Sequence, residues 1–234
     1  MNNEQADDQL WPARALLLLV LGAVMGLLFD GLVRADQDYG LFSSWTDDPV
    51  RLSLATFVAI SGLLFAFTLE RNRPEWTVGF AVAGGVILGL VFYWNGGPDR
   101  YGGADSVWRF VAGLLAVAIA APLFQTLRDE GAWRLPYVDV HAHSWTNVVL
   151  WFAAWAFVGI SWLLAFLLSQ LFALIGIDLL EDALGKSWFP WMLTCGALGA
   201  AVGLLRDRDR ILGLLQRVVT TILSVLAPVL ALGL

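Results

Sequence analysis

The sequence predicts an all-α protein, a single domain built as a bundle of about seven transmembrane helices. Three observations lead to this prediction. Apolar residues make up 59% of the 234 residues, charged residues only 15%, and the mean hydropathy is +0.71. A water-soluble domain contains ~45–50% apolar and ~25% charged residues. The apolar residues also form long runs between short charged stretches, so lipid is the expected solvent for most of the chain.

A spanning helix needs about 20 predominantly apolar residues. The runs that meet this requirement predict spans at residues 14–33, 52–70, 76–95, 107–127, 146–170, 189–205 and 211–234. The residues before the first run are acidic, and no small-residue cleavage site follows it. The first run is therefore predicted to be a retained helix and not a cleaved signal peptide.

The fifth apolar run continues to Ile177 and is too long for one upright span, so we expect a break near Ser169 and Gln170. The following stretch, residues 171–187, places Asp178, Glu181 and Asp182 on one helical face. It is predicted to be a helix that lies in the membrane interface. The last span ends in apolar residues at Leu234, and we therefore expect the chain to be part of a longer polypeptide.

The distribution of basic residues in the short loops predicts a cytoplasmic N-terminus. With that orientation the cytoplasmic side carries nine arginines: Arg14, Arg71, Arg73, Arg128, Arg134, Arg206, Arg208, Arg210 and Arg217. The opposite side carries five basic residues: Arg34, Arg51, Arg100, Arg109 and Lys186. Nine of the twelve tryptophans lie close to predicted span ends, as an aromatic belt would place them: Trp11, Trp45, Trp76, Trp94, Trp108, Trp133, Trp145, Trp188 and Trp191.

Three pairs of glycines have the four-residue spacing that lets transmembrane helices approach closely. They are Gly22 with Gly26, Gly85 with Gly89, and Gly199 with Gly203. We expect these pairs to pack helices within the bundle, and association between chains is the alternative. The only cysteine, Cys195, cannot form an intrachain disulfide.

The stretch "YVDVHAHSWTN" contains both histidines of the chain, His141 and His143, two and four residues after Asp139. In an extended strand these three side chains would point to one side, as metal ligation requires. A hydrolytic metal site needs further ligands and a base, and the chain has no other histidine to supply them. We therefore predict neither a metal nor a cofactor here. The stretch is interpreted as a loop that enters the fifth span through Ser144 or Thr146 as an N-cap.

Two other features are candidate binding sites. The first is the turn "RDRDR", where Arg206, Arg208 and Arg210 either form a solvated turn or contact a lipid headgroup or a partner's carboxylate. The second is the stripe of Trp151, Trp155 and Trp162 on the fifth span, which either fills the bundle interior or lines a groove for an apolar ligand. No charged residue is placed near mid-membrane, and Pro122 is a candidate helix break.

Several of these motifs together resemble a family of bacterial multi-pass inner-membrane proteins classed as a domain of unknown function. The matching features lie in about the last hundred residues: the paired histidines followed by Trp145 and Asn147, the Ile-Gly-Ile-Asp turn at 175–178, and the Asp-Arg-Asp-Arg turn at 207–210. The resemblance implies an all-helical protein of the bacterial cytoplasmic membrane, in a chain with more spans. It carries no established activity, cofactor or catalytic residue.

The sequence therefore favours a non-enzymatic membrane component that binds the lipid bilayer and a partner, either another membrane protein or a second copy of itself. No catalytic residue is assigned. The net charge of −6 argues against nucleic acid as a partner. A transporter or permease-like unit with a polar path near Pro122 is the alternative. A membrane-embedded enzyme using Asp139, His141 and His143 ranks third.

Overall fold

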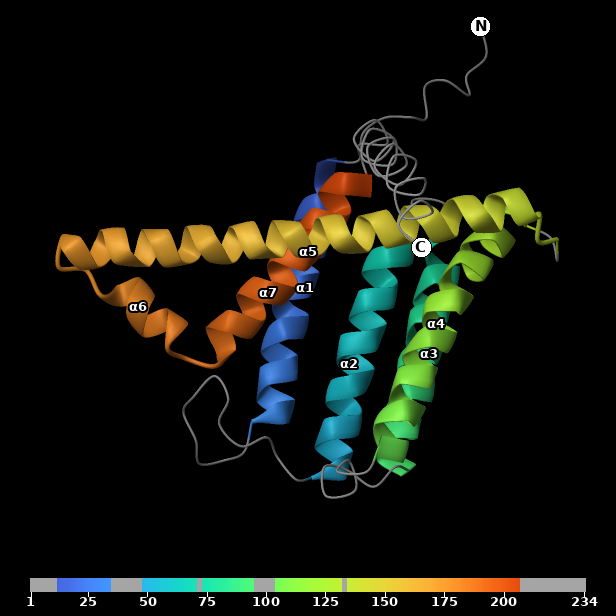
Figure 1. Ribbon diagram of the computed structural model, residues 1–234, viewed down its shortest axis with the longest axis horizontal. Coiled ribbons are helices and arrows are strands. Elements are labelled where there is room, and N and C mark those ends of the chain that lie inside the picture. The colour runs from blue at the N-terminus through green and yellow to red at the C-terminus, as the bar shows by residue number, and fades with distance from the viewer. Residues whose placement is uncertain (1–11, 35–47, 71–72, 95–103, 132–133, 207–234) are drawn as a thin grey trace, which may run out of the picture.

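The computed structural model describes residues 12–34, 48–70, 73–94, 104–131 and 134–206, and these residues form an all-α bundle (Figure 1). Its helices are α1 (Pro12–Val33), α2 (Pro49–Thr68), α3 (Pro74–Trp94), α4 (Ala104–Glu130), α5 (Tyr137–Leu174), α6 (Leu179–Leu184) and α7 (Trp188–Arg206). All except α6 are long and apolar enough to cross a membrane, which makes six such helices. The chain is a multi-pass membrane protein.

The first four predicted spans and the sixth correspond to α1, α2, α3, α4 and α7. Local sequence explains several helix ends. Pro49 and Pro74 occupy the first positions of α2 and α3, where a missing backbone N–H costs nothing. The Asp48 carboxylate caps α2 by accepting a hydrogen bond from the backbone N–H of Val50 at 2.9 Å. The seventh predicted span, 211–234, lies outside the described residues.

The fifth span differs from the prediction at both of its ends. It is one helix of 38 residues, about 57 Å long at 1.5 Å per residue. The break expected near Ser169 and Gln170 was wrong, because α5 continues through them and Ser169 is buried. The helix ends at Leu174, and Gly176, with a φ of +79°, closes the turn that follows it. The backbone N–H groups of Gly176 and Ile177 donate to the carbonyls of Ala173 and Phe172.

The predicted interfacial helix at 171–187 was also wrong in extent. Its first residues belong to α5, and only Leu179–Leu184 forms the short helix α6. Asp178 precedes α6 at the N-cap position, so Glu181 and Asp182 are the acidic residues within the helix. The predicted helix is interrupted because Gly176 closes the turn after α5 and separates α5 from α6.

The N-cap predicted for the fifth span was wrong as well. Helix α5 begins at Tyr137, directly after Pro136, so Ser144 and Thr146 lie inside it. The Ser144 hydroxyl donates to the carbonyl of Val140, one turn earlier, at 2.7 Å. A hydroxyl that bonds its own helix in this way is tolerated within a helix and does not start one.

The glycine pairs form the closest helix contacts. Helices α1 and α7 run antiparallel, and Gly22 and Gly26 lie against the backbone of Cys195 and Trp191. Gly199 and Gly203 lie against the backbone of Leu18 and Ala15. A Cβ atom at Gly199 would be 2.1 Å from the carbonyl oxygen of Leu18. The prediction that glycine spacing packs helices within the bundle is confirmed at this interface.

Helices α2 and α3 pack through the third glycine pair. A Cβ atom at Gly85 would overlap the hydroxyl of Ser61, and one at Gly89 would be 3.1 Å from the carbonyl oxygen of Ser53. The Ser53 hydroxyl donates to the carbonyl of Gly89 at 2.7 Å. The bundle therefore contains two closely packed helix pairs, α1 with α7 and α2 with α3.

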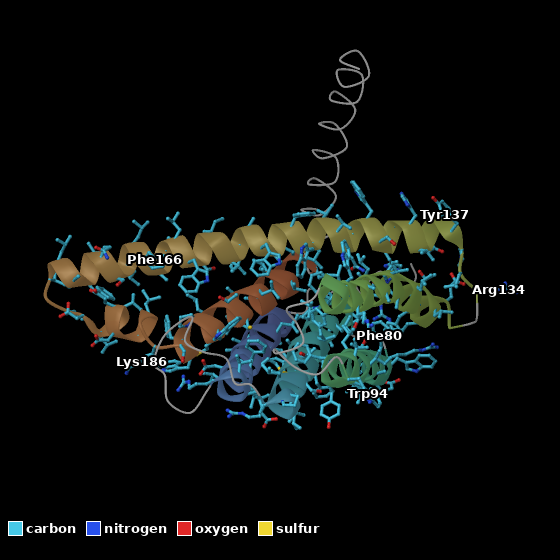
Figure 2. All side chains as sticks on the ribbon, turned by 60° about the horizontal axis from the view of Figure 1, so that its bottom comes forward. Phe80, Trp94, Arg134, Tyr137, Phe166 and Lys186 are labelled. Carbon is cyan, nitrogen blue, oxygen red and sulfur yellow. The ribbon has the colours of Figure 1, made fainter. Side chains whose placement is uncertain are left out.

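Helix α5 lies crosswise to the other long helices, and its second half extends beyond them (Figure 1). The same arrangement is visible after a turn of the view, with Tyr137 at one end and Phe166 on the extended half (Figure 2). An upright helix needs about 20 residues to cross the ~30 Å hydrocarbon core. A helix of 38 residues fits that core only if it is strongly inclined or projects beyond it.

The basic residues gather at two opposite ends of the bundle. Arg14, Arg128 and Arg206 all donate to backbone carbonyls at the C-terminal end of α2. At the N-terminal end of α2, Arg51 donates to the carbonyls of Gly31 and Arg34 at 3.0 and 2.9 Å. For these residues the division into two sides agrees with the division predicted from loop composition.

Gly199→Ala should destabilise the protein by about 2 kcal/mol, because the added Cβ meets the backbone of α1 and neither helix can withdraw without opening the interface. Gly79→Ala on α3 is the matched control, since nothing lies within 4 Å of a Cβ atom there. That change should be neutral or stabilising by up to about 1 kcal/mol. Equilibrium unfolding in mixed micelles measures both, and equal effects of the two substitutions would contradict the packing described for α1 and α7.

Candidate functional site

The C-terminal end of α2 is the meeting point of four other helices. Helix ends leave carbonyl groups without intrahelical partners, and here side chains from elsewhere in the chain satisfy them. The Thr68 carbonyl accepts from Arg128 Nη1 at 2.6 Å and from Thr77 Oγ1 at 3.0 Å. The Leu69 carbonyl accepts from Arg14 and from Arg206 Nη1. Positive charge also stabilises this negative end of the helix dipole.

Arg128 is the central cation of this region, with 2% of its surface exposed. Its guanidinium forms ion pairs with the carboxylates of Glu70 and Asp129 and lies 5.9 Å from the centre of the Phe124 ring. The two carboxylates are about two-fifths exposed. The buried cation is therefore fully paired, and the anions that pair with it face outward.

Two polar pairs, which we call the polar ladder, connect α4 to α5. Asn147 Nδ2 donates to Gln125 Oε1 at 2.8 Å, and Gln125 Nε2 also donates to the carbonyl of Phe67 at 3.0 Å. One turn further out, His143 Nε2 lies 3.2 Å from Asp129 Oδ2. The pairs are four residues apart on each helix, so they occupy one face of α4 and one face of α5. Together they hold the end of α4 against the beginning of α5.

Beyond the polar ladder, α4 and α5 separate around an apolar groove of about 700 Å³, the lateral groove. Its walls come from α2 between Ile60 and Phe67, α4 between Val111 and Leu123, and α5 between Val140 and Phe152. Ser144 and Asn147 are the polar side chains in this lining. Large apolar side chains form exposed lips on both sides, namely Leu115 and Ile119 on α4 and Val148 and Phe152 on α5.

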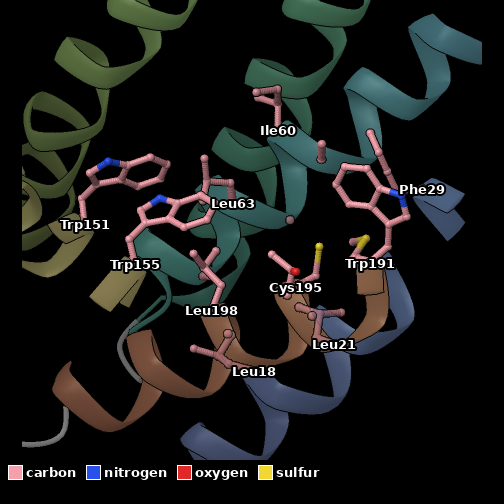
Figure 3. Close-up of a pocket in the computed structure, with 17 residues that line it drawn as sticks. Leu18, Leu21, Phe29, Ile60, Leu63, Trp151, Trp155, Trp191, Cys195 and Leu198 are labelled. Carbon is pink, nitrogen blue, oxygen red and sulfur yellow. The ribbon is translucent and has the colours of Figure 1, made fainter. Parts of the chain in front are cut away.

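A second apolar space, the inner hollow, has a volume of about 250 Å³ (Figure 3). It lies among α1 between Leu18 and Phe29, α2 between Ala59 and Ala66, the side chains of Trp151 and Trp155, and α7 between Trp191 and Gly199. Thr194 and Cys195 are its polar lining residues. Ile60, Leu63 and Trp151 line both this hollow and the lateral groove.

The predicted tryptophan stripe faces the inner hollow. Trp151 and Trp155 line it, with ring centres 5.7 Å apart. Trp162 reaches the same region, because its Nε1 donates to the hydroxyl of Thr194 at 3.0 Å. The stripe therefore packs α5 against α7 and borders an apolar space, and the groove for an apolar ligand stays a prediction.

Asp139, His141 and His143 do not form the side-by-side set that an extended strand would give. They lie in the first two turns of α5, where residues two apart point in nearly opposite directions. His141 stacks on Tyr137, with ring centres 5.8 Å apart, while His143 pairs with Asp129. The expectation that this stretch is a loop was wrong. Among the described residues, no group of three His, Cys, Asp or Glu side chains is placed to hold a metal ion.

The other residues singled out in the sequence have structural contacts. Trp145 packs against the largest core cluster, and Asn147 belongs to the polar ladder. Arg206 donates to the carbonyl of Leu69 at 3.2 Å. Arg208 and Arg210 lie outside the described residues, so the predicted contact of this turn with a headgroup stays a prediction.

The network around Arg128 and Gln125 was not predicted from the sequence. Arg14 and Arg128 were considered only as loop charges, although both are buried in the fold. A signal was present, because Gln125 is a lone amide inside an apolar run and Asn147 is another at the start of the next run. Spacing within one helix could not show that the two amides face each other.

Arg128→Met should lower the free energy of unfolding by about 1–3 kcal/mol, because the carbonyl of Thr68 then loses a charged hydrogen-bond donor. Lys186→Met, at an exposed position, is the control and should change stability by less than about 0.5 kcal/mol. Unfolding in mixed micelles measures both variants. Arg128→Met with wild-type stability would show that the carbonyls of α2 do not depend on this guanidinium.

Gln125→Leu and Asn147→Leu should be energetically coupled by about 0.6–1.7 kcal/mol in a double-mutant cycle, between the average and the largest value found for hydrogen bonds between transmembrane helices. Gln125→Leu combined with Ser53→Ala, at the other end of α2, should be additive. Additive effects of Gln125→Leu and Asn147→Leu would mean that the amide pair does not connect α4 to α5.

No family model matches the chain, and no curated protein or solved structure is significantly similar to it. The resemblance to the bacterial membrane family therefore stays a prediction that rests on the motifs quoted above.

Proposed function

We propose that the protein is a non-enzymatic integral membrane component that binds a lipid molecule in the lateral groove. The observation that carries this proposal is the position of the groove between α4 and α5. It has apolar walls, exposed apolar lips and a polar end at the ladder. An elongated apolar space with one polar end matches the chemistry of an amphiphile.

The lips of the groove indicate how a ligand would reach it. Ile119 is 64% exposed and Phe152 is 69% exposed. Side chains of this kind on spanning helices face the acyl chains of the bilayer. A lipid chain can therefore enter sideways from the membrane without passing through water. The volume also lies within the ~300–1,000 Å³ that ligand sites occupy.

The polar ladder supports the same ligand class. Asn147 lines the groove and His143 lies one turn further out, about three-tenths exposed. The half-exposed carboxylates of Asp129 and Glu70 lie beside Arg128 at the same end. A lipid whose chain fills the groove would place its polar headgroup near these side chains.

The transporter alternative has less support. That alternative predicts a polar path near Pro122, whereas Pro122 lines a groove in which Ser144 and Asn147 are the only polar side chains among the described residues. A hydrated solute would gain few hydrogen bonds there. The enzyme alternative would need Asp139, His141 and His143 to act together, and His141 is directed to Tyr137 and His143 to Asp129.

We further propose that this protein resides in the bacterial cytoplasmic membrane, with the end that carries Arg14, Arg128 and Arg206 on the cytoplasmic side. The positive-inside rule supports the orientation. The family resemblance supports the choice of membrane. With this orientation the polar ladder would lie at the cytoplasmic interface, and the headgroup of the bound lipid would belong to the inner leaflet.

Ala118→Trp should remove the bound lipid, because Ala118 is an exposed residue that lines only the lateral groove and the indole would fill the space of the chain. We would release the protein from nanodiscs of mixed phosphatidylethanolamine and phosphatidylglycerol and record its mass under native conditions. Wild-type protein should retain lipid, and Ala118→Trp should retain at least about tenfold less, since several buried methylene groups are lost.

Ala83→Trp on α3 is the control, because Ala83 is also exposed and lines neither space. It should retain lipid as the wild type does. A wild-type protein without lipid, or equal lipid retention by Ala118→Trp, would overturn the proposal. So would a second protein chain in place of the lipid in the released complex.

A further inference from the structure

The lateral groove and the inner hollow lie on either side of one ridge on α2. The ridge consists of Ile60 and Leu63, which line both spaces. Ala59 and Ala66 face only the inner hollow, while Leu64 and Phe67 face only the lateral groove. Two apolar spaces therefore run beside each other, separated by two side chains of one helix.

The two spaces have similar lengths along their walls. The lateral groove follows α4 from Val111 to Leu123, which is about 18 Å of helix. The inner hollow follows α1 from Leu18 to Phe29, which is about 17 Å. Each of these walls is long enough for an extended hydrocarbon chain to lie along it.

Trp151 is the side chain that borders both spaces from α5, and Figure 3 shows it beside the inner hollow. Its ring contacts Phe67 at 6.0 Å and Trp155 at 5.7 Å between ring centres, and the residue is 37% exposed. It lies one helical turn beyond Asn147, the inner member of the polar ladder. The junction of the two spaces is therefore close to the polar end of the groove.

The inner hollow is poorly suited to water. An ordered water molecule requires two to four polar partners. The polar side chains that line this hollow are Thr194 and Cys195, and the Thr194 hydroxyl already accepts a hydrogen bond from Trp162. An empty apolar space forfeits dispersion contacts along its walls. A hydrocarbon chain would satisfy the lining better than either water or a void.

We propose that the ligand is a two-chain lipid that straddles the Ile60–Leu63 ridge, with one chain in the lateral groove and the other in the inner hollow. The branch point between the chains lies at Trp151, and the headgroup lies at the polar ladder. This inference rests on the proposed function and adds the class of lipid. A single-chain lipid would fill the lateral groove and leave the inner hollow unoccupied.

Ala59→Leu tests the inference, because Ala59 lines the inner hollow alone and is exposed, so a larger side chain can enter the hollow without displacing a packed neighbour. The probes are nanodiscs that contain palmitoyl-oleoyl phosphatidylethanolamine and, separately, micelles of the single-chain lysophosphatidylethanolamine. The headgroup is the same in both. Retained lipid is measured by native mass spectrometry, and circular dichroism verifies that each variant keeps its helix content.

Ala59→Leu should reduce retention of the two-chain lipid about tenfold, because two or more methylene groups of one chain lose their site. Retention of the single-chain lipid should not change. Ala118→Trp should reduce retention of both lipids, and Ala83→Trp should reduce neither.

Unchanged retention of the two-chain lipid by Ala59→Leu would overturn the inference and leave the groove-binding proposal standing. An equal loss of both lipids in Ala59→Leu would also overturn it, since the inner hollow would then affect binding without distinguishing the chains. Retention of neither lipid by the wild-type protein would overturn the proposed function itself.

Discussion

The carbonyl groups at the C-terminal end of α2 impose the constraint on which the rest of the bundle depends. This end lies among the other helices, and a buried carbonyl without a donor is costly. The donors come from Arg14 on α1, Thr77 on α3, Gln125 and Arg128 on α4, and Arg206 on α7. One helix end thereby fixes the positions of four neighbouring helices. Through Asn147, it fixes α5 as well.

The lateral groove follows from that fixed point and from the length of α5. The polar ladder joins α4 and α5 at one end. Helix α5 is too long to stand upright beside α4 in a bilayer of ordinary thickness, and it lies crosswise to the bundle (Figure 1). Two helices that are held at one end and inclined to each other must separate at the other. The groove occupies the space between them.

Glycine packing explains why the rest of the bundle does not close over these spaces. The pairs α1 with α7 and α2 with α3 approach until backbone meets backbone. Contacts of that kind are hard to rearrange, because the glycines of one helix lie directly against the backbone of the other. The inner hollow lies where these two closely packed pairs and α5 meet, and large aromatic side chains such as Trp151 and Trp191 fill the junction only in part.

Polar networks lie at both ends of the bundle, and the apolar spaces lie between them. The end that carries Arg14, Arg128 and Arg206 contains the polar ladder and the outward-facing carboxylates of Glu70 and Asp129. The opposite end contains a smaller network in which Arg34 pairs with Asp30 at 2.7 Å and also contacts Ser187. Both spaces are apolar between these ends, so each end supplies an interface and the middle accommodates hydrocarbon.

The sequence by itself determined the all-α class, five of the spans nearly to their ends, the packing role of the glycine pairs and the division of the described arginines between two sides. These properties depend on local composition and on residues three or four apart, which one helix is enough to define. The tertiary structure alone decided that α5 is a single inclined helix and that Asp139 and His143 lie on a helix. It also decided that Gln125 faces Asn147 and that Arg128 caps α2. These features depend on which faces of distant helices meet, and no spacing within one segment records that choice.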